Sequence, residues 1–88
     1  MMNMTNYEFE EFRSRMFLAD KHYEDAWVAL NCGCTHDAIK KLNTAKKYYK
    51  EALQITINKN AGCVTEARMG IQKCNELLTS IKNESKEM

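Results

Sequence analysis

The residues best suited to metal chemistry lie in one short loop. Cys32, Cys34 and His36 occupy every second position, and thiolates and imidazoles are ligands that zinc prefers. A tetrahedral site needs a fourth ligand, for which the chain offers only Cys63 or His22, and the Cys-x-x-Cys pair typical of zinc sites is absent. We therefore expect an ordinary turn here and no metal.

Catalytic residues are not apparent in the sequence. Nucleophilic catalysis requires a nucleophile, a positioned base and an oxyanion pocket, and no stretch of the chain supplies that combination. His22, in the run DKHYED, is typical of a surface or interface histidine. The sequence predicts a protein that is not an enzyme and that uses no cofactor.

Near the N-terminus, aromatic residues are followed by cationic ones. In NYEFEEFRSR, Tyr7 precedes the apolar stripe, and Arg13 and Lys21 follow on later turns. A ring at a helix entrance can stack on a base while the cations hold phosphates. It can instead act as a hydrophobic staple that fixes the helix entry, and both interpretations stay open.

The lysine-rich run KKLNTAKKYYK also mixes cations with aromatic rings. A nucleic-acid polymer is not the expected partner, because 13 basic and 12 acidic residues give a net charge of only +1. Residues 1–30 carry six acidic and three basic residues, whereas residues 31–60 carry two acidic and six basic ones. We expect a solvated helical face that offsets the acidic N-terminal segment.

Apolar residues recur at alternating steps of three and four in three segments, which is the pattern of amphipathic helices. We expect helices near 7–31, 36–58 and 65–83, with Gly33 and Gly62 ending the first two and Thr35 and Thr65 capping the next. Short loops force neighbouring helices to run antiparallel. The prediction is an all-α, three-helix domain over 1–88, with frayed ends at 1–6 and 84–88. The expected core positions are Phe9, Phe12, Met16, Ala19, Tyr23, Ala26 and Leu30; Ala38, Leu42, Ala45, Tyr49, Ala52 and Ile55; and Val64, Ala67, Ile71, Cys74, Leu78 and Ile81.

Several large apolar residues lie off these stripes. An 88-residue chain buries only about 60% of its unfolded surface, so a second apolar stripe favours a subunit interface and self-association. Gly70, inside the third helix, suggests close approach of another backbone. The residues off the stripes are Phe17, Trp27, Tyr48, Leu53 and Ile57.

Arg68 and Gln72 lie about 100° around the third helix from Ala67 and Ile71. They stack on one flank, at the boundary of the core. That flank is suited to a partner chain or an anionic ligand.

No stretch approaches the roughly 18 apolar residues of a membrane span, and the N-terminus is acidic, unlike a secretory leader. We expect a cytoplasmic protein with reduced thiols and no membrane partner.

The third segment resembles the last helix of a known family, the small phage proteins that block CBASS defence by sequestering its cyclic oligonucleotide signals. The matching residues are Ala67-Arg68, Ile71-Gln72, Cys74, Leu78 and Ile81; Tyr7, with Lys21 or His22, occupies places similar to that family's N-terminal tyrosine and lysine. The resemblance implies a homohexamer that holds cyclic dinucleotides such as 3′,3′-cGAMP between protomers without cleaving them. The candidate ligand-binding residues are then Tyr7, Phe9, Arg13, Lys21, His22, Arg68 and Gln72.

The second segment resembles a different family. In CGCTHDAIKKLNTAKKYYKEALQI, the spacing of glycine, alanines, leucine and tyrosine is similar to the second helix of MIT domains, which bind amphipathic helices of ESCRT subunits. The same spacing occurs in TPR units. The alternative function is therefore a helical protein-interaction module.

Overall fold

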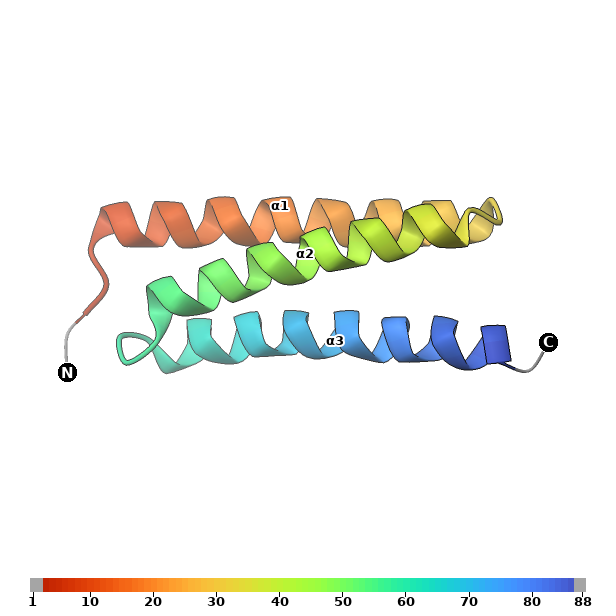
Figure 1. Cartoon of the computed structure of the whole chain (residues 1–88). Coiled ribbons are helices and arrows are strands. Elements are labelled where there is room, and N and C mark those ends of the chain that lie inside the picture. The colour runs from red at the N-terminus through yellow and green to blue at the C-terminus, as the bar shows by residue number, and fades with distance from the viewer. Residues whose placement is uncertain (1–2, 87–88) are drawn as a thin grey trace.

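The computed structural model describes residues 3–86 and consists of three α-helices joined by short loops (Figure 1). The helices are α1 (Asn6–Asn31), α2 (Thr35–Thr56) and α3 (Ala61–Lys86). This arrangement confirms the predicted all-α, three-helix fold.

The start of α1 is fixed by a capping box. The Thr5 side chain accepts a hydrogen bond from the Glu8 backbone N–H at 3.1 Å, and the Glu8 carboxylate accepts one from the Thr5 N–H at 3.0 Å. Met4, ahead of the cap, is buried against Phe12. The chain is therefore held in place closer to its N-terminus than the expected frayed segment 1–6.

The first loop follows the expected glycine mechanism. Gly33 has φ of +79°, in the left-handed region that favours glycine, and its N–H bonds the Leu30 carbonyl at 3.0 Å. Cys34, and not Thr35, occupies the N-cap position of α2, without a side-chain hydrogen bond to the helix. Thr35 is the first helical residue.

The second loop lies earlier in the chain than predicted. α2 ends at Thr56 instead of 58, and α3 begins at Ala61 instead of 65. Asn58 takes the left-handed conformation with φ of 66°, and the Asn60 side-chain oxygen accepts a hydrogen bond from the Cys63 N–H at 3.1 Å. Asparagine thus performs both roles that the sequence analysis gave to Gly62 and Thr65. At the other end, α3 continues through residues 84–86, which were expected to fray; residues 87–88 lie outside the described residues.

The predicted stripe of α2 is the centre of the core. Ala38, Leu42, Ala45, Tyr49 and Ala52 all have no exposed surface. α2 packs extensively against both α1 and α3, which explains the complete burial of its stripe.

The stripes of α1 and α3 are buried less completely. Phe9 is 37% exposed, although it was placed in the core, and Leu78 is half-buried. Ala67 and Cys74 have no exposed surface, as expected. The incomplete burial follows from packing, because α1 and α3 each have only α2 as an extensive neighbour.

Gly70 marks a close approach, but of a side chain and not of a backbone. A Cβ atom at Gly70 would lie 2.4 Å from Cδ1 of Tyr49. The absence of a side chain at Gly70 lets the buried tyrosine ring pack directly against α3.

Figure 1 shows α1 and α3 running in the same direction, with α2 antiparallel to both and crossing obliquely between them. The molecule is elongated, with extents of 51 × 18 × 14 Å. No helix in the described part of the chain has an apolar stretch long enough to span a bilayer.

Three ion pairs join the acidic N-terminal segment to the later part of the chain, and the third, between Asp20 and Lys73, belongs to the site described below. The Arg15 guanidinium lies 2.9 Å from a Glu51 carboxylate oxygen. Lys59 donates a hydrogen bond to Glu8, and this bond lowers the pKa of the Glu8 carboxyl. The lysines of the KKLNTAKKYYK run on α2 make no ion pair among the described residues, as expected of a solvated face.

Candidate functional site

A groove runs between α1 and α3, because both helices pack on α2 and scarcely touch each other. Two hollows mark its course, each lined from both helices. The hollow of about 500 Å³ near the N-terminal ends of the two helices is lined by Asn6, Phe9, Phe12, Arg13, Met16, Cys63 and Glu66. The hollow of about 240 Å³ farther along is lined by Tyr23, Trp27, Lys73, Glu76, Leu77 and Ser80. We call this surface the α1–α3 groove.

A polar cluster from all three helices borders the second hollow. The Tyr49 hydroxyl of α2 donates a hydrogen bond to the Asp20 carboxylate of α1. Lys73 of α3 lies 3.7 Å from the same carboxylate oxygen, and its ammonium lies 4.5 Å from the centre of the Tyr23 ring. The Asp20–Lys73 pair therefore bridges the two walls of the groove.

Tyr49 is the buried member of this cluster. Burial, and then the hydrogen bond to Asp20, raise the pKa of the Tyr49 hydroxyl well above its usual value of 10.0. The hydroxyl is therefore a neutral hydrogen-bond donor at physiological pH. Asp20 and Lys73 are 53% and 42% exposed at their side chains, so solvent screens their attraction.

Aromatic rings form one wall of the second hollow. Tyr23 and Trp27 pack edge to face, with ring centroids 6.5 Å apart and an interplanar angle of 76°. Trp27 is 45% exposed, and Leu77 of α3 lines the same hollow. An exposed indole beside a half-buried tyrosine and an aliphatic side chain is suited to bury an apolar side chain of a partner.

The first hollow combines an aromatic ring with a cation. Phe9 and Arg13 of α1 line it together, and Cys63 and Glu66 of α3 lie on its other side. Burial, and then the charge of Glu66, raise the pKa of the Cys63 thiol, so this thiol is not an activated nucleophile.

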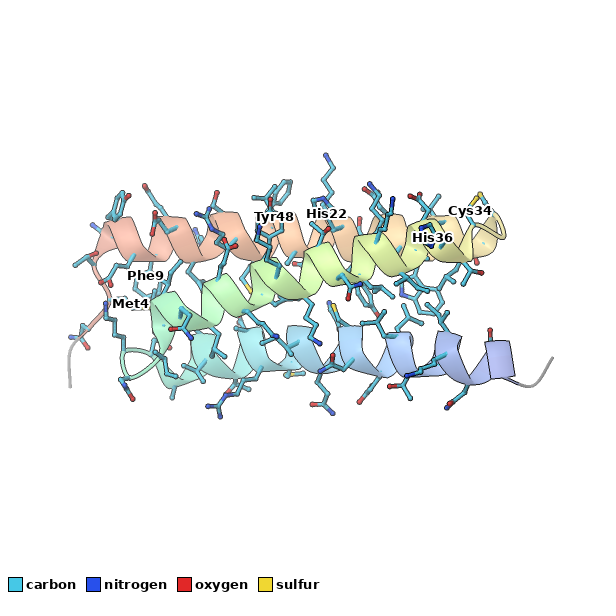
Figure 2. The ribbon with its side chains drawn as sticks, viewed as in Figure 1. Met4, Phe9, His22, Cys34, His36 and Tyr48 are labelled. Atoms are coloured by element: carbon cyan, nitrogen blue, oxygen red, sulfur yellow. The ribbon has the colours of Figure 1, made fainter. Side chains whose placement is uncertain are left out.

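The other candidate residues of α1 lie away from this hollow. Tyr7 is 69% exposed, and its hydroxyl donates a hydrogen bond to Glu11 at 3.2 Å, so it does not act as a hydrophobic staple. Lys21 is exposed. His22 faces α2, with its Nδ1 atom 2.8 Å from the Leu18 carbonyl oxygen and its ring centroid 5.6 Å from that of Tyr48 (Figure 2).

Arg68 and Gln72 share a flank, as the sequence indicated, and line one hollow on α3. Gln72 donates a hydrogen bond to Glu76 at 2.9 Å. Arg68 is five residues before Lys73, about 140° around the helix, so this flank faces away from the α1–α3 groove. Within one chain, two pairs of candidate residues share a hollow: Phe9 with Arg13, and Arg68 with Gln72. The two pairs lie in different hollows, and Tyr7, Lys21 and His22 line neither of them.

The cysteine-rich loop holds no assembled metal site. Cys32 and Cys34 are exposed at the α1–α2 loop, and Figure 2 shows His36 at the beginning of α2. In residues 3–86, no group of three or more histidine, cysteine or acidic side chains is placed to hold a metal ion.

The central cluster has no recognisable pattern in the sequence. Asp20 and Lys73 have no distinguishing pattern in the sequence, and Tyr23 was assigned only to the apolar stripe. The only indication of this cluster in the sequence is Gly70, a glycine inside a helix, which marks the position where the Tyr49 ring contacts α3.

In comparisons with known proteins, the chain matches no family model, no curated protein and no solved structure.

Proposed function

We propose that this chain is a non-catalytic protein-interaction module whose α1–α3 groove binds an amphipathic helix of a partner protein. One observation carries the proposal. Because α1 and α3 both pack on α2 and scarcely touch each other, Tyr23, Trp27 and Leu77 line an open groove, in which Trp27 is 45% exposed while Tyr23 and Leu77 are partly buried against the core. Partly exposed aromatic residues of this kind are the usual anchors of protein interfaces.

The dimensions of the groove suit a helix. Its α1 wall extends from Phe9 to Trp27, a rise of roughly 27 Å at about 1.5 Å per residue. A partner helix of similar length, with apolar residues three and four positions apart, can fill both hollows along one face. Its polar flanks can then reach Lys73, which lines the second hollow, and Asp20, which lies 3.7 Å from Lys73.

The test is a selection of helical peptides from a displayed library with one randomised face, followed by calorimetry with the selected peptides. Trp27 and Val28 provide a matched pair, because they are adjacent and exposed by 45% and 60%, yet only Trp27 lines the groove. We expect Trp27→Ala to weaken binding by about tenfold or more, and Val28→Ala to leave it nearly unchanged. Peptides that bind both variants equally well would show that the groove is not the binding site.

Trp27 also provides a direct optical signal. It is the only tryptophan of the chain, so intrinsic fluorescence reports on the groove without a label. A bound apolar side chain should shift the emission to shorter wavelength and protect the indole from acrylamide quenching.

We propose cyclic dinucleotide sequestration as a second function, favoured by one observation. Phe9 and Arg13 line the same hollow of about 500 Å³, which combines a stacking surface with a phosphate-binding guanidinium. A complete site would require a second chain to supply Tyr7, Lys21 or Arg68, as in the hexamer that the phage-family resemblance implies.

Calorimetry with 3′,3′-cGAMP separates the two functions. Sequestration predicts measurable heat, loss of binding in Arg13→Ala, recovery of the intact nucleotide and little change in Trp27 fluorescence. No heat, together with peptide binding that depends on Trp27, would eliminate this second function and retain the first.

A further inference from the structure

The face of α1 opposite the core carries two large apolar side chains that are mostly exposed to solvent. Phe17 is 68% exposed and Val28 is 60% exposed. Ala19 and Ala26, on the core side of the same helix, have no exposed surface. α1 therefore has a second, outward stripe that none of the described residues covers.

Four residues define this outward stripe. Phe17, Lys21, Glu24 and Val28 are separated by four, three and four positions, so they lie in one line along the helix. All four are exposed. The two apolar residues are at the ends of the line, and the two oppositely charged residues are between them.

The spacing of the stripe is the same in both directions. If a second copy of the chain lies antiparallel on this face, Phe17 meets Val28 of the second copy and Lys21 meets Glu24 of the second copy. A two-fold axis repeats both contacts, which gives two apolar and two ionic pairs. In the parallel orientation, Lys21 would face Lys21 and Glu24 would face Glu24, and both pairs would repel.

We infer that the chain forms an antiparallel homodimer through the Phe17–Lys21–Glu24–Val28 stripe of α1. The occupant of this face is a second copy because the stripe is complementary to itself in both apolarity and charge. Two other residues that the sequence assigned to self-association have different surroundings: Tyr48 packs beside His22, and Trp27 lines the α1–α3 groove.

Dimerisation leaves the proposed peptide groove open. Phe17 and Val28 line neither hollow of the groove. The dimer therefore presents two grooves and can bind a partner with two helices more tightly than one chain can. The inference does not depend on the proposed function, because it concerns a different face of α1.

The first measurement is the mass of the whole chain in solution as a function of concentration. A contact between single helices is small, so the interface belongs to the weak, transient class and should assemble in the high micromolar range. Sedimentation equilibrium should give 10.2 kDa in dilute solution and approach twice that mass as concentration rises. A mass of 10.2 kDa throughout that range overturns the inference.

Charge reversal tests the pairing itself. Lys21→Glu and Glu24→Lys each place like charges in contact, so each variant alone should be monomeric. An equimolar mixture of the two restores opposite charges at both ionic pairs and should dimerise again, as should the double variant K21E/E24K. Variants that self-associate as the wild type does, or a mixture that stays monomeric, overturn the inference.

A final variant tests the apolar contact. Phe17→Ser should abolish the dimer without changing the helical circular dichroism, because Phe17 is exposed in the single chain. It should also leave peptide binding at Trp27 intact, which separates failure of the dimer from failure of the proposed function. An undiminished dimer, or an assembly larger than two that survives the substitution, contradicts the pairing.

Discussion

Substitution of Gly70 by alanine tests the closest contact between α2 and α3. A methyl group there would lie 2.4, 2.5 and 2.7 Å from three carbon atoms of the Tyr49 ring. Packed carbon atoms prefer separations of about 3.5–4.0 Å, so the ring or the helix must move by roughly 1 Å. The ring cannot move freely, because Tyr49 is fully buried and its hydroxyl is bonded to Asp20.

Two opposing effects determine the free energy of unfolding of Gly70→Ala. Overpacking a buried site costs about 1–3 kcal/mol, and the rigid surroundings of Tyr49 favour the upper end of that range. Alanine recovers about 1 kcal/mol through its higher helix propensity. We expect a net loss of about 2 kcal/mol, which corresponds to a fall in Tm of roughly 8–16 °C for a domain of this size.

Gly62→Ala is the matched control, measured by urea denaturation with circular dichroism. Gly62 lies in the first turn of the same helix, and a methyl group there would meet only the Asn60 side-chain oxygen, at 3.4 Å. We expect this substitution to stabilise the protein by about 0.4–1 kcal/mol. The packing argument is refuted if Gly70→Ala is as stable as Gly62→Ala or the wild type.

Three further predictions concern the cap, the buried tyrosine and the thiols. Thr5→Ala removes the capping box and should lower the free energy of unfolding by about 0.5–2 kcal/mol in urea denaturation; an unchanged midpoint would contradict the cap's role. Burial and a hydrogen bond raise the pKa of the Tyr49 hydroxyl, so above pH 10.0 the unfolded state releases a proton that the folded state keeps. The melting temperature should therefore fall as the pH rises above 10.0, and it should fall less steeply with pH in the Tyr49→Phe variant. Equal pH dependence of the melting temperature in the two proteins would contradict the assignment of this loss of stability to Tyr49. Iodoacetamide at neutral pH should modify Cys32 and Cys34, which are exposed, and spare Cys74, which has no exposed surface and whose pKa burial raises to about 11; rapid labelling of Cys74, detected by mass spectrometry, would contradict its burial.

The helices could be predicted from the sequence because their apolar periodicity is strong. The prediction was most accurate for α2, where every residue from Ala38 to Ala52 in the stripe is fully buried between two neighbours. The loop between α2 and α3 was predicted several residues too far along the chain, because glycine is typical of a helix C-terminus and threonine of a helix N-cap, and Gly62 and Thr65 have these residue types. Asn58 and Asn60 perform those roles instead, since asparagine tolerates left-handed φ and can cap a helix with its side chain.

The groove could not be predicted from the sequence because it depends on how far apart α1 and α3 lie. Periodicity shows which face of a helix is apolar, but not how many neighbours cover that face. Trp27 was recognised as lying off the main stripe, and its position in a groove became evident only with the partner wall formed by Lys73 and Leu77. The Asp20–Lys73 pair likewise joins residues far apart in the chain whose types are common on any helical surface.

The central claim is that the α1–α3 groove is the binding surface, and residue-by-residue nuclear magnetic resonance tests it most directly. A selected helical peptide is added to isotope-labelled protein until saturation, and shifts of the backbone amides and of the Trp27 indole N–H are followed. The account predicts the largest changes at Tyr23, Trp27 and Leu77, with little change at Phe17, which lines neither hollow of the groove. Changes confined to the lysine-rich outer face of α2, or no changes in the groove at saturation, would contradict it.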